Sequence, residues 1–178
     1  MLYHHSRDLE SVVFGEVKGN PEFSDPDFRK AYLWLEKEVG FYPLFLAVGA
    51  TEEDIKMTCY GDNWIAKTSR KKGEFPNNVL FSFNDVKGVF TDYQYWHFIL
   101  NANNKNYSMT YHEKKLIFKP SWKESDWLRK ARKEPHSVQL VAPKLYLPDA
   151  SRIWVRNNAT RSLLNKLGFQ NIEVRRIS

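Results

Sequence analysis

The sequence predicts a single α+β domain over residues 1–178, with a mainly antiparallel or mixed sheet and about four helices. Its 178 residues are 42% hydrophobic and 27% charged, which is enough apolar material for one core. Amphipathic helical patterns alternate with short apolar runs, but without the regular strand–helix–strand order of a parallel sheet. A single cysteine, Cys59, excludes an internal disulfide framework and a multi-thiolate metal site.

The clearest helical segment of the first half begins near Ser24 and ends before Gly40. Ser24 suits an N-cap, and Pro26 falls in the first turn, where a proline is tolerated. Apolar side chains recur on one face of this helix, at Phe28, Tyr32, Leu35 and Val39.

Three further helices are predicted from capping residues. Asp92 is expected to cap a helix over residues 93–101, whose inward side chains are Tyr95, Phe98 and Ile99. A capping box of Ser121 and Glu124 opens a helix over residues 122–133, which Pro135 ends. Asn158 is expected to cap the last helix, which ends at Gly168.

Short apolar or alternating runs predict the strands, at residues 42–48, 79–83, 107–111, 115–119, 137–147, 152–156 and 170–177. The runs 107–111 and 115–119 are expected to pair as a hairpin. The charged run 170–177 is expected at a sheet edge. Residues 69–78 contain three consecutive basic residues, Gly73 and Pro76, and are therefore expected to form an exposed loop.

Charge is distributed unevenly along the chain. Residues 1–89 hold 11 basic and 14 acidic residues, whereas residues 90–178 hold 16 and 7, so the net charges are −3 and +9. A basic surface from the second half would suit nucleic acid or an acidic protein, although a solvated face without a ligand is equally compatible with it. The first residues lack the layout of a signal peptide, and no run is long enough to span a membrane, so a cytoplasmic protein that does not contact membranes is expected.

Several common catalytic motifs are missing. The glycines form neither dinucleotide-binding nor P-loop spacing, and H-E-x-x-H, G-x-S-x-G and C-x-x-C do not occur. No cofactor and no metal are therefore indicated, and a lone Cys59 is more typical of a buried hydrophobe than of a nucleophile.

The most distinctive stretch contains Asp92-Tyr93, Trp96-His97 and Leu100-Asn101. It resembles the D-[FY]-x-x-W-H-x-x-L-N pattern of an uncharacterised bacterial family, which implies no particular activity. One interpretation makes His97 a general acid/base, with Asp92 and Tyr93 as its partners. Asp92 and His97 would lie about 140° apart around an ideal helix, so a purely structural role for the motif, with Asp92 as the N-cap, is favoured.

A second constellation combines aromatic and basic residues on and directly after one predicted helix: Trp122, Lys123, Trp127, Arg129, Lys130, Arg132, Lys133 and His136. The aromatic rings would stack on bases while the cations contact phosphate. The loop residues Arg70, Lys71 and Lys72 and the C-terminal arginines 152, 156, 161, 175 and 176 would extend this surface. The alternative is that Trp127 belongs to the core and the charges only aid solubility.

Two further resemblances concern cofactor-using enzymes. The segment from Asn158 to Phe169 is similar to the final helix of acetyltransferases that use acetyl-coenzyme A, but the glycine-rich phosphate loop of that family is missing. The opening residues, with His4 and His5, resemble the first strand of ADP-ribosyltransferases that use NAD. In that resemblance Gln139 stands where a glutamate is expected.

The leading hypothesis is thus a small basic intracellular protein that binds nucleic acid, with RNA or single strands preferred, as an accessory or regulator of a mobile element. If it cleaves RNA, His4, His5, His97 and His112 are the acid/base candidates. An NAD-using enzyme and an inhibitor whose basic face meets an acidic protein are the alternatives.

Overall fold

The computed structural model describes residues 1–20, 26–49, 74–96, 110–134 and 137–175. Within them a seven-stranded sheet has the order β5-β6-β3-β1-β4-β8-β9. Its strands are β1 (Leu2–Asp8), β3 (Leu44–Val48), β4 (Glu74–Phe83), β5 (Val89–Asp92), β6 (Val138–Ala142), β8 (Arg152–Val155) and β9 (Ile172–Val174). All neighbouring strands of this sheet are antiparallel except β8 and β9, which are parallel. The predicted α+β class with a mainly antiparallel sheet is confirmed, and the C-terminal strand lies at an edge as expected.

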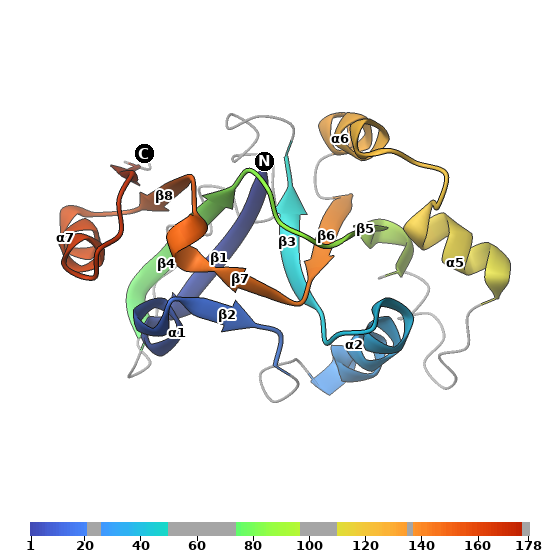
Figure 1. Ribbon diagram of the computed structural model, residues 1–178, viewed down its shortest axis with the longest axis horizontal. Helices are drawn as coiled ribbons and strands as arrows, with labels where there is room; N and C mark the ends of the chain where they lie inside the picture. Colours follow the sequence, from blue (N-terminus) through green and yellow to red (C-terminus); the bar gives the residue numbers. More distant parts are fainter. Residues whose placement is uncertain (21–25, 50–73, 97–109, 135–136, 176–178) are drawn as a thin grey trace.

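A second, two-stranded sheet pairs β2 (Glu16–Lys18) with β7 (Lys144–Tyr146) and lies across the large sheet (Figure 1). The described helices are α1 (Leu9–Phe14), α2 (Pro26–Val39), α5 (Tyr111–Phe118), α6 (Glu124–Lys133) and α7 (Asn158–Lys166), with a 3₁₀ turn, η3 (Leu147–Asp149). Residues 93–96 begin a further helix directly after β5. In Figure 1, α5 and α6 lie at the β5 end of the sheet and α7 lies at the β8 end.

The short helix α1 was not predicted, yet its two ends are specified locally. The Glu10 amide donates to the Asp8 carboxylate at 3.1 Å, which caps the N-terminus. Gly15 adopts a left-handed conformation with φ of 82° and donates its amide to the Ser11 carbonyl. Glycine adopts this conformation without a steric penalty, so Gly15 ends the helix after six residues.

The predicted hairpin over 107–111 and 115–119 is wrong for its described part, because Tyr111–Phe118 form α5. A reciprocal capping box nucleates this helix. The Glu113 amide donates to the Thr110 hydroxyl at 3.2 Å, and the Thr110 amide donates to the Glu113 carboxylate at 2.6 Å. The apolar residues 116–118 were interpreted as a strand although the T-x-x-E signature precedes them. Residues 107–109 lie outside the described part of the chain.

Three other predictions need correction: the start of α6, the extent of a loop and the burial of Tyr95. Helix α6 begins at Glu124, and the Asp126 carboxylate, rather than the Ser121 box, accepts the Lys123 amide at 2.9 Å. The loop predicted over 69–78 is wrong from Glu74 onward, because β4 begins at that residue and pairs with β1. Pro76 is tolerated in this strand because it lies near a shift in the register of the two strands. Residues 69–73 are outside the described ranges. Tyr95 is 40% exposed, so it does not pack inward as expected.

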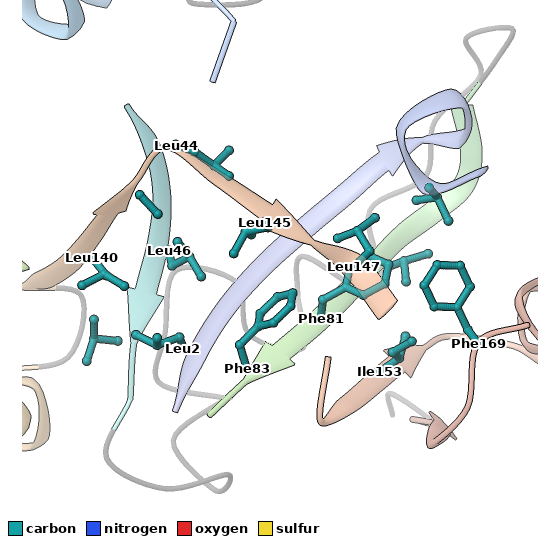
Figure 2. Close-up of a cluster of buried hydrophobic side chains, with 14 of the residues drawn as sticks. Leu2, Leu44, Leu46, Phe81, Phe83, Leu140, Leu145, Leu147, Ile153 and Phe169 are labelled. Atoms are coloured by element: carbon teal, nitrogen blue, oxygen red, sulfur yellow. The ribbon is translucent and has the colours of Figure 1, made fainter. Parts of the chain in front are cut away.

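The main core lies on one face of the sheet. Figure 2 shows Phe81 and Phe83 of β4 and Leu46 of β3 on this face, with Leu145 and Leu147 from β7 and η3 above them. Helix α7 closes one end, where the Phe169 ring meets that of Phe81 at 6.0 Å in an edge arrangement. Helix α6 closes the other end through Trp127, which stacks on Phe90 at 5.9 Å. Both ends therefore bury aromatic rings, which carry much of the core energy.

A second cluster lies on the opposite face, near β3. Ala31, Trp34 and Leu35 of α2 pack there with Trp96 and Ile117, the latter from α5. The predicted apolar stripe of α2 is confirmed at Leu35. The Phe45 ring stacks on Trp96 at 5.5 Å, so this cluster is anchored on the sheet. It holds α5 and the segment after β5 in fixed positions.

Candidate functional site

The candidate site lies at the β5 end of the sheet, and its base is the carboxylate of Asp92. Asp92 is the last residue of β5 and is fully buried. Its Oδ1 accepts the Tyr95 amide at 3.3 Å, which supports the expected N-cap role. Its Oδ2 lies 3.3 Å from the Lys119 ammonium and 3.4 Å from that of Lys130. One buried carboxylate thus joins β5, the end of α5 and the middle of α6.

The two lysines that meet Asp92 are themselves largely withdrawn from solvent, with side chains 13% and 14% exposed. Burial by itself lowers the pKa of Lys130, but a hydrogen bond to Glu134 at 2.6 Å and the charge of Asp92 outweigh it and raise that pKa. Lys130 therefore stays protonated. A buried charge is tolerated only when it is paired, so Asp92, Lys119 and Lys130 form a structural unit.

The Lys119 ammonium also lies between two aromatic rings. It is 4.9 Å from the ring centroid of Tyr95 and 5.1 Å from that of Trp122. Trp122 is 37% exposed, and its ring contacts the ring of the buried Trp127 edge-on, with 5.0 Å between the two ring centroids. This contact restricts the orientation of the Trp122 ring. Cation–π contacts thus bring Tyr95 and Trp122 close to the same positive charge, and part of each ring remains open to solvent.

Helix α6 carries further exposed cations at this end of the sheet. Arg129, Arg132 and Lys133 fall within about 100° around the helix, on the side away from Trp127. Arg129 forms an ion pair with Asp126 on the same helix. We call the set of rings and cations at this end the basic–aromatic surface: Tyr95, Lys119, Trp122, Lys123, Arg129, Arg132 and Lys133, all of them exposed except Lys119. Residues 110–134 hold eight basic and four acidic residues, a net charge of +4 within the chain's +6.

The structure separates the residues predicted from sequence into three groups. Trp122, Arg129, Arg132 and Lys133 belong to the basic–aromatic surface. Trp127 is 3% exposed and Lys130 faces Asp92, so their assignment as nucleic-acid contacts was wrong. The remaining candidates His97, Arg70, Lys71 and Lys72 lie outside the described residues.

Two members of the surface were missed by sequence reasoning. Tyr95 was assigned to the core, but its side chain is 40% exposed and the next residue, Trp96, is the buried one. Lys119 was assigned to a strand, so its place between two aromatic residues was not apparent. Tyr93, a catalytic candidate, is half-buried and meets Trp96 edge-on at 5.2 Å, which is a packing role.

The C-terminal arginines that the structure describes do not extend the basic–aromatic surface, and Arg176 lies outside the described residues. Arg152 is on β8, four strand positions from β6, which α6 covers. At about 4.8 Å per strand this separation is about 19 Å. Arg161 is on α7 and Arg175 follows β9, at the same far end. The expectation of one continuous surface is therefore wrong for these residues.

The residues that suggested an NAD-using enzyme fall on different sides of the sheet. Strand alternation places His4 on the face of Phe81, and places His5 on the opposite face, together with Leu80 and Gln139. Desolvation lowers the pKa of His4 to about 4, although its Nδ1 hydrogen bond to the Phe45 carbonyl at 3.3 Å acts in the other direction. His4 is thus a neutral structural group at physiological pH.

A cavity of about 320 Å³ lies beside the end of α7. Its lining is uncharged and consists of Leu147, Pro148, Ala150, Ile153, Leu167, Gly168, Phe169, Gln170 and Asn171. It offers no cation for the phosphates of coenzyme A, so it does not support the acetyltransferase resemblance. Among the described residues there is no cluster of three metal-binding side chains, and no helix there is long and apolar enough to cross a membrane.

Comparison of the chain with protein-family models, curated proteins and solved structures found no match.

Proposed function

We propose that the protein binds single-stranded nucleic acid, RNA in particular, through the basic–aromatic surface. The observation that carries the proposal is the placement of Lys119 between the partly exposed rings of Tyr95 and Trp122. Exposed rings beside cations suit a strand whose bases stack while its phosphates are neutralised.

Charge supplies the affinity in this proposal. Lys123, Arg129, Arg132 and Lys133 are exposed, and Lys123 directly follows Trp122 in the chain. Each phosphate contact releases counterions, so binding must weaken steeply as salt rises. The acidic Asp126 and Glu134 each pair with a basic residue of the same helix, which reduces their repulsion of a phosphate backbone.

The rings supply the preference for single strands. A base that is unpaired and unstacked presents its π-face to an aromatic side chain, whereas a base inside a duplex does not. Trp122 is fixed by Trp127 and Lys119, so little conformational entropy is lost when a base stacks on it.

The experiment measures fluorescence anisotropy of labelled single-stranded RNA, single-stranded DNA and duplex DNA over a salt series. Wild-type protein is expected to bind the single strands more tightly than the duplex, with a steep salt dependence. Trp122→Ala is expected to weaken binding by about 1–3 kcal/mol, and Trp122→Phe by less, because a ring is retained.

Leu163→Ala on α7 is the control, since Leu163 is exposed to a similar degree, 38%, at the far end of the sheet. Absence of binding at low salt, or equal losses in Trp122→Ala and Leu163→Ala, would contradict the proposal. Binding of an acidic protein with no binding of nucleic acid would instead favour the inhibitor alternative.

A further inference from the structure

The two edge strands of the large sheet, β5 and β9, are covered differently. Strand β5 contacts α5 and is followed directly by the helical residues 93–96. Strand β9 pairs with β8 and contacts α7, which lies on the core face, because Leu164 and Phe169 belong to the main core. Within the part of the chain that the structure describes, no strand pairs with the outer edge of β9, which lies beside the mark C in Figure 1.

The backbone groups of two β9 residues point out from this edge. The Asn171 carbonyl accepts an amide of β8 at 3.0 Å, and the Arg175 amide donates to a carbonyl of β8 at 2.8 Å. The hydrogen-bonding groups of successive strand residues alternate in direction, so Glu173 also faces β8. The amides and carbonyls of Ile172 and Val174 therefore face outward, where a further strand can pair with them.

The side chains at this edge divide between the two faces of the sheet. Ile172 and Val174 pack against the main core. Strand alternation then places Glu173 on the other face, and Arg175, two positions further along, on the same face as Glu173. The edge thus carries one acidic and one basic side chain on the face away from the core, on either side of Val174.

These charges favour one register for pairing two copies of β9. In an antiparallel pair, residues with outward-facing groups lie directly opposite each other and exchange two hydrogen bonds. With Ile172 opposite Val174, Glu173 would face its own copy, and like charges at that position are destabilising. With Ile172 opposite Ile172, Glu173 would face the neutral Asn171. With Val174 opposite Val174, each Glu173 faces the Arg175 of the other copy.

We propose that two copies of the protein associate through β9 in an antiparallel, two-fold symmetric pair, with Val174 at its centre and Glu173 paired with Arg175 in both directions. A symmetric dimer uses the same surface of both subunits, and a strand with opposite charges about its own centre provides such a surface. The main-chain hydrogen bonds continue the sheet from one copy into the other.

The expected dimer is weak and independent of the proposed function. Strand β9 has three residues, so its edge buries less area than a standard interface, and association is expected to depend on concentration. The basic–aromatic surface lies at the opposite edge of the sheet, so nucleic-acid binding is not needed for this pairing.

The test measures association of the whole chain by sedimentation velocity over a concentration series. Wild-type protein is expected to shift from monomer to dimer as its concentration rises. Glu173→Arg and Arg175→Glu are each expected to raise the dissociation constant by about tenfold or more, because two attractive cross-strand pairs become two repulsive ones. Asp85→Arg reverses the charge of an exposed residue between β4 and β5, and this control is expected to associate as the wild type does.

Mixing the two charge-reversed variants tests the pairing itself. In a mixed dimer, the two arginines of Glu173→Arg face the two glutamates of Arg175→Glu. A heterodimer with about the affinity of the wild type is therefore expected, although each variant alone associates weakly. Variants that had merely lost their fold would not recover association on mixing, so failure of the mixture to associate would contradict the proposed register.

A disulfide at Val174 tests the centre of the pair. Directly opposite residues that exchange hydrogen bonds have Cα atoms about 5.5 Å apart, which is within disulfide range. In a Cys59→Ser background, mild oxidation is expected to join two copies of Val174→Cys. Ile172→Cys is not expected to crosslink, because its two copies would lie four positions, or about 13 Å, apart. Val13→Cys, at a valine of α1 that is 59% exposed, is the control for random collision.

Three further results would overturn the proposal. The first is a protein that stays monomeric over the whole concentration series. The second is association that neither Glu173→Arg nor Arg175→Glu weakens, which would place the interface on another surface. The third is crosslinking of Val174→Cys that is no faster than that of Ile172→Cys or Val13→Cys.

Discussion

The two ends of the large sheet carry similar charge but are built differently. At the β5 end, the partly exposed rings of Tyr95 and Trp122 lie beside the Lys119 ammonium, which forms a buried unit with Asp92 and Lys130. At the β9 end, Arg152 meets Glu173 at 3.8 Å with both side chains about half exposed, and α7 carries exposed cations. Charge alone therefore does not distinguish the ends, whereas buried pairing and fixed aromatic rings do.

The largest expected effect is on the free energy of unfolding, and it differs between the buried ion pairs of Asp92 and the exposed ion pair of Glu173. Asp92→Asn keeps an oxygen that accepts the Tyr95 amide but removes the charge that Lys119 and Lys130 share. It is expected to lower the free energy of unfolding by about 3–5 kcal/mol, because breaking a buried pair leaves uncompensated charge. Glu173→Gln at the other end is expected to cost less than about 1 kcal/mol. Denaturant unfolding measures both, and equal losses would contradict the structural unit at Asp92.

The second effect concerns the centre of the sheet, which both ends share. The pKa of His4 is about 4 when folded and about 6.5 when unfolded, so the unfolded state binds more protons between these values. Stability contributed by neutral His4 is therefore complete above pH 6.5, and up to about 3 kcal/mol of it is lost as pH falls to 4.

Denaturant unfolding from pH 7.5 to 4 measures this loss, and His4→Gln is expected to reduce the dependence. His112→Gln, which changes an exposed histidine of α5, is the control. A dependence that His4→Gln leaves unchanged would assign the acid sensitivity to other groups.

The third effect compares equal charge changes at the two ends. The double variant Arg129→Gln with Arg132→Gln removes two cations from α6, and Arg161→Gln with Lys166→Gln removes two from α7. If the α6 pair contacts two phosphates of a single strand, the slope of log affinity against log salt falls by about 1.4 in magnitude. The α7 pair is expected to leave the slope unchanged, and matching slopes in both variants would remove the distinction between the ends.

The smallest expected effect is the loss of stability when the N-cap side chains of α5 and α7 are removed. Thr110→Ala removes the hydroxyl that accepts the Glu113 amide, and Asn157→Ala removes the carbonyl that accepts the Thr160 amide at 2.9 Å. Each is expected to cost about 1 kcal/mol of unfolding free energy. Only Thr110→Ala is expected to weaken RNA binding as well, because α5 ends at the basic–aromatic surface. Weakened binding in Asn157→Ala alone would contradict the location of the site.

The sequence predicted the elements that local signals specify and missed those that depend on contacts far along the chain. The Asp92 cap and the helix that Asn157 caps were near their expected places. Helix α5 was missed because three apolar residues were given more weight than its capping box. The role of Lys130 was not predictable, since its partner Asp92 lies 38 positions earlier and reaches it only through the fold.

The sequence predicted the α6 cations of the basic–aromatic surface but not its residues Tyr95 and Lys119. A run of basic residues after Trp122 is visible in the sequence, because α6 is continuous. The buried state of Trp127 follows from the stacking of its ring on Phe90 of β5, which no local pattern reveals. Tyr95 and Lys119 are 24 positions apart and become neighbours only because β5 and α5 pack together.

The most direct test of the basic–aromatic surface is photocrosslinking of single-stranded RNA that contains 4-thiouridine, followed by mass spectrometry of the attached peptides. The structure predicts crosslinks to peptides that contain Tyr95 or Trp122, and their loss in Trp122→Ala for the second peptide. Crosslinks confined to α7 and β9, at the other basic end of the sheet, would contradict the account.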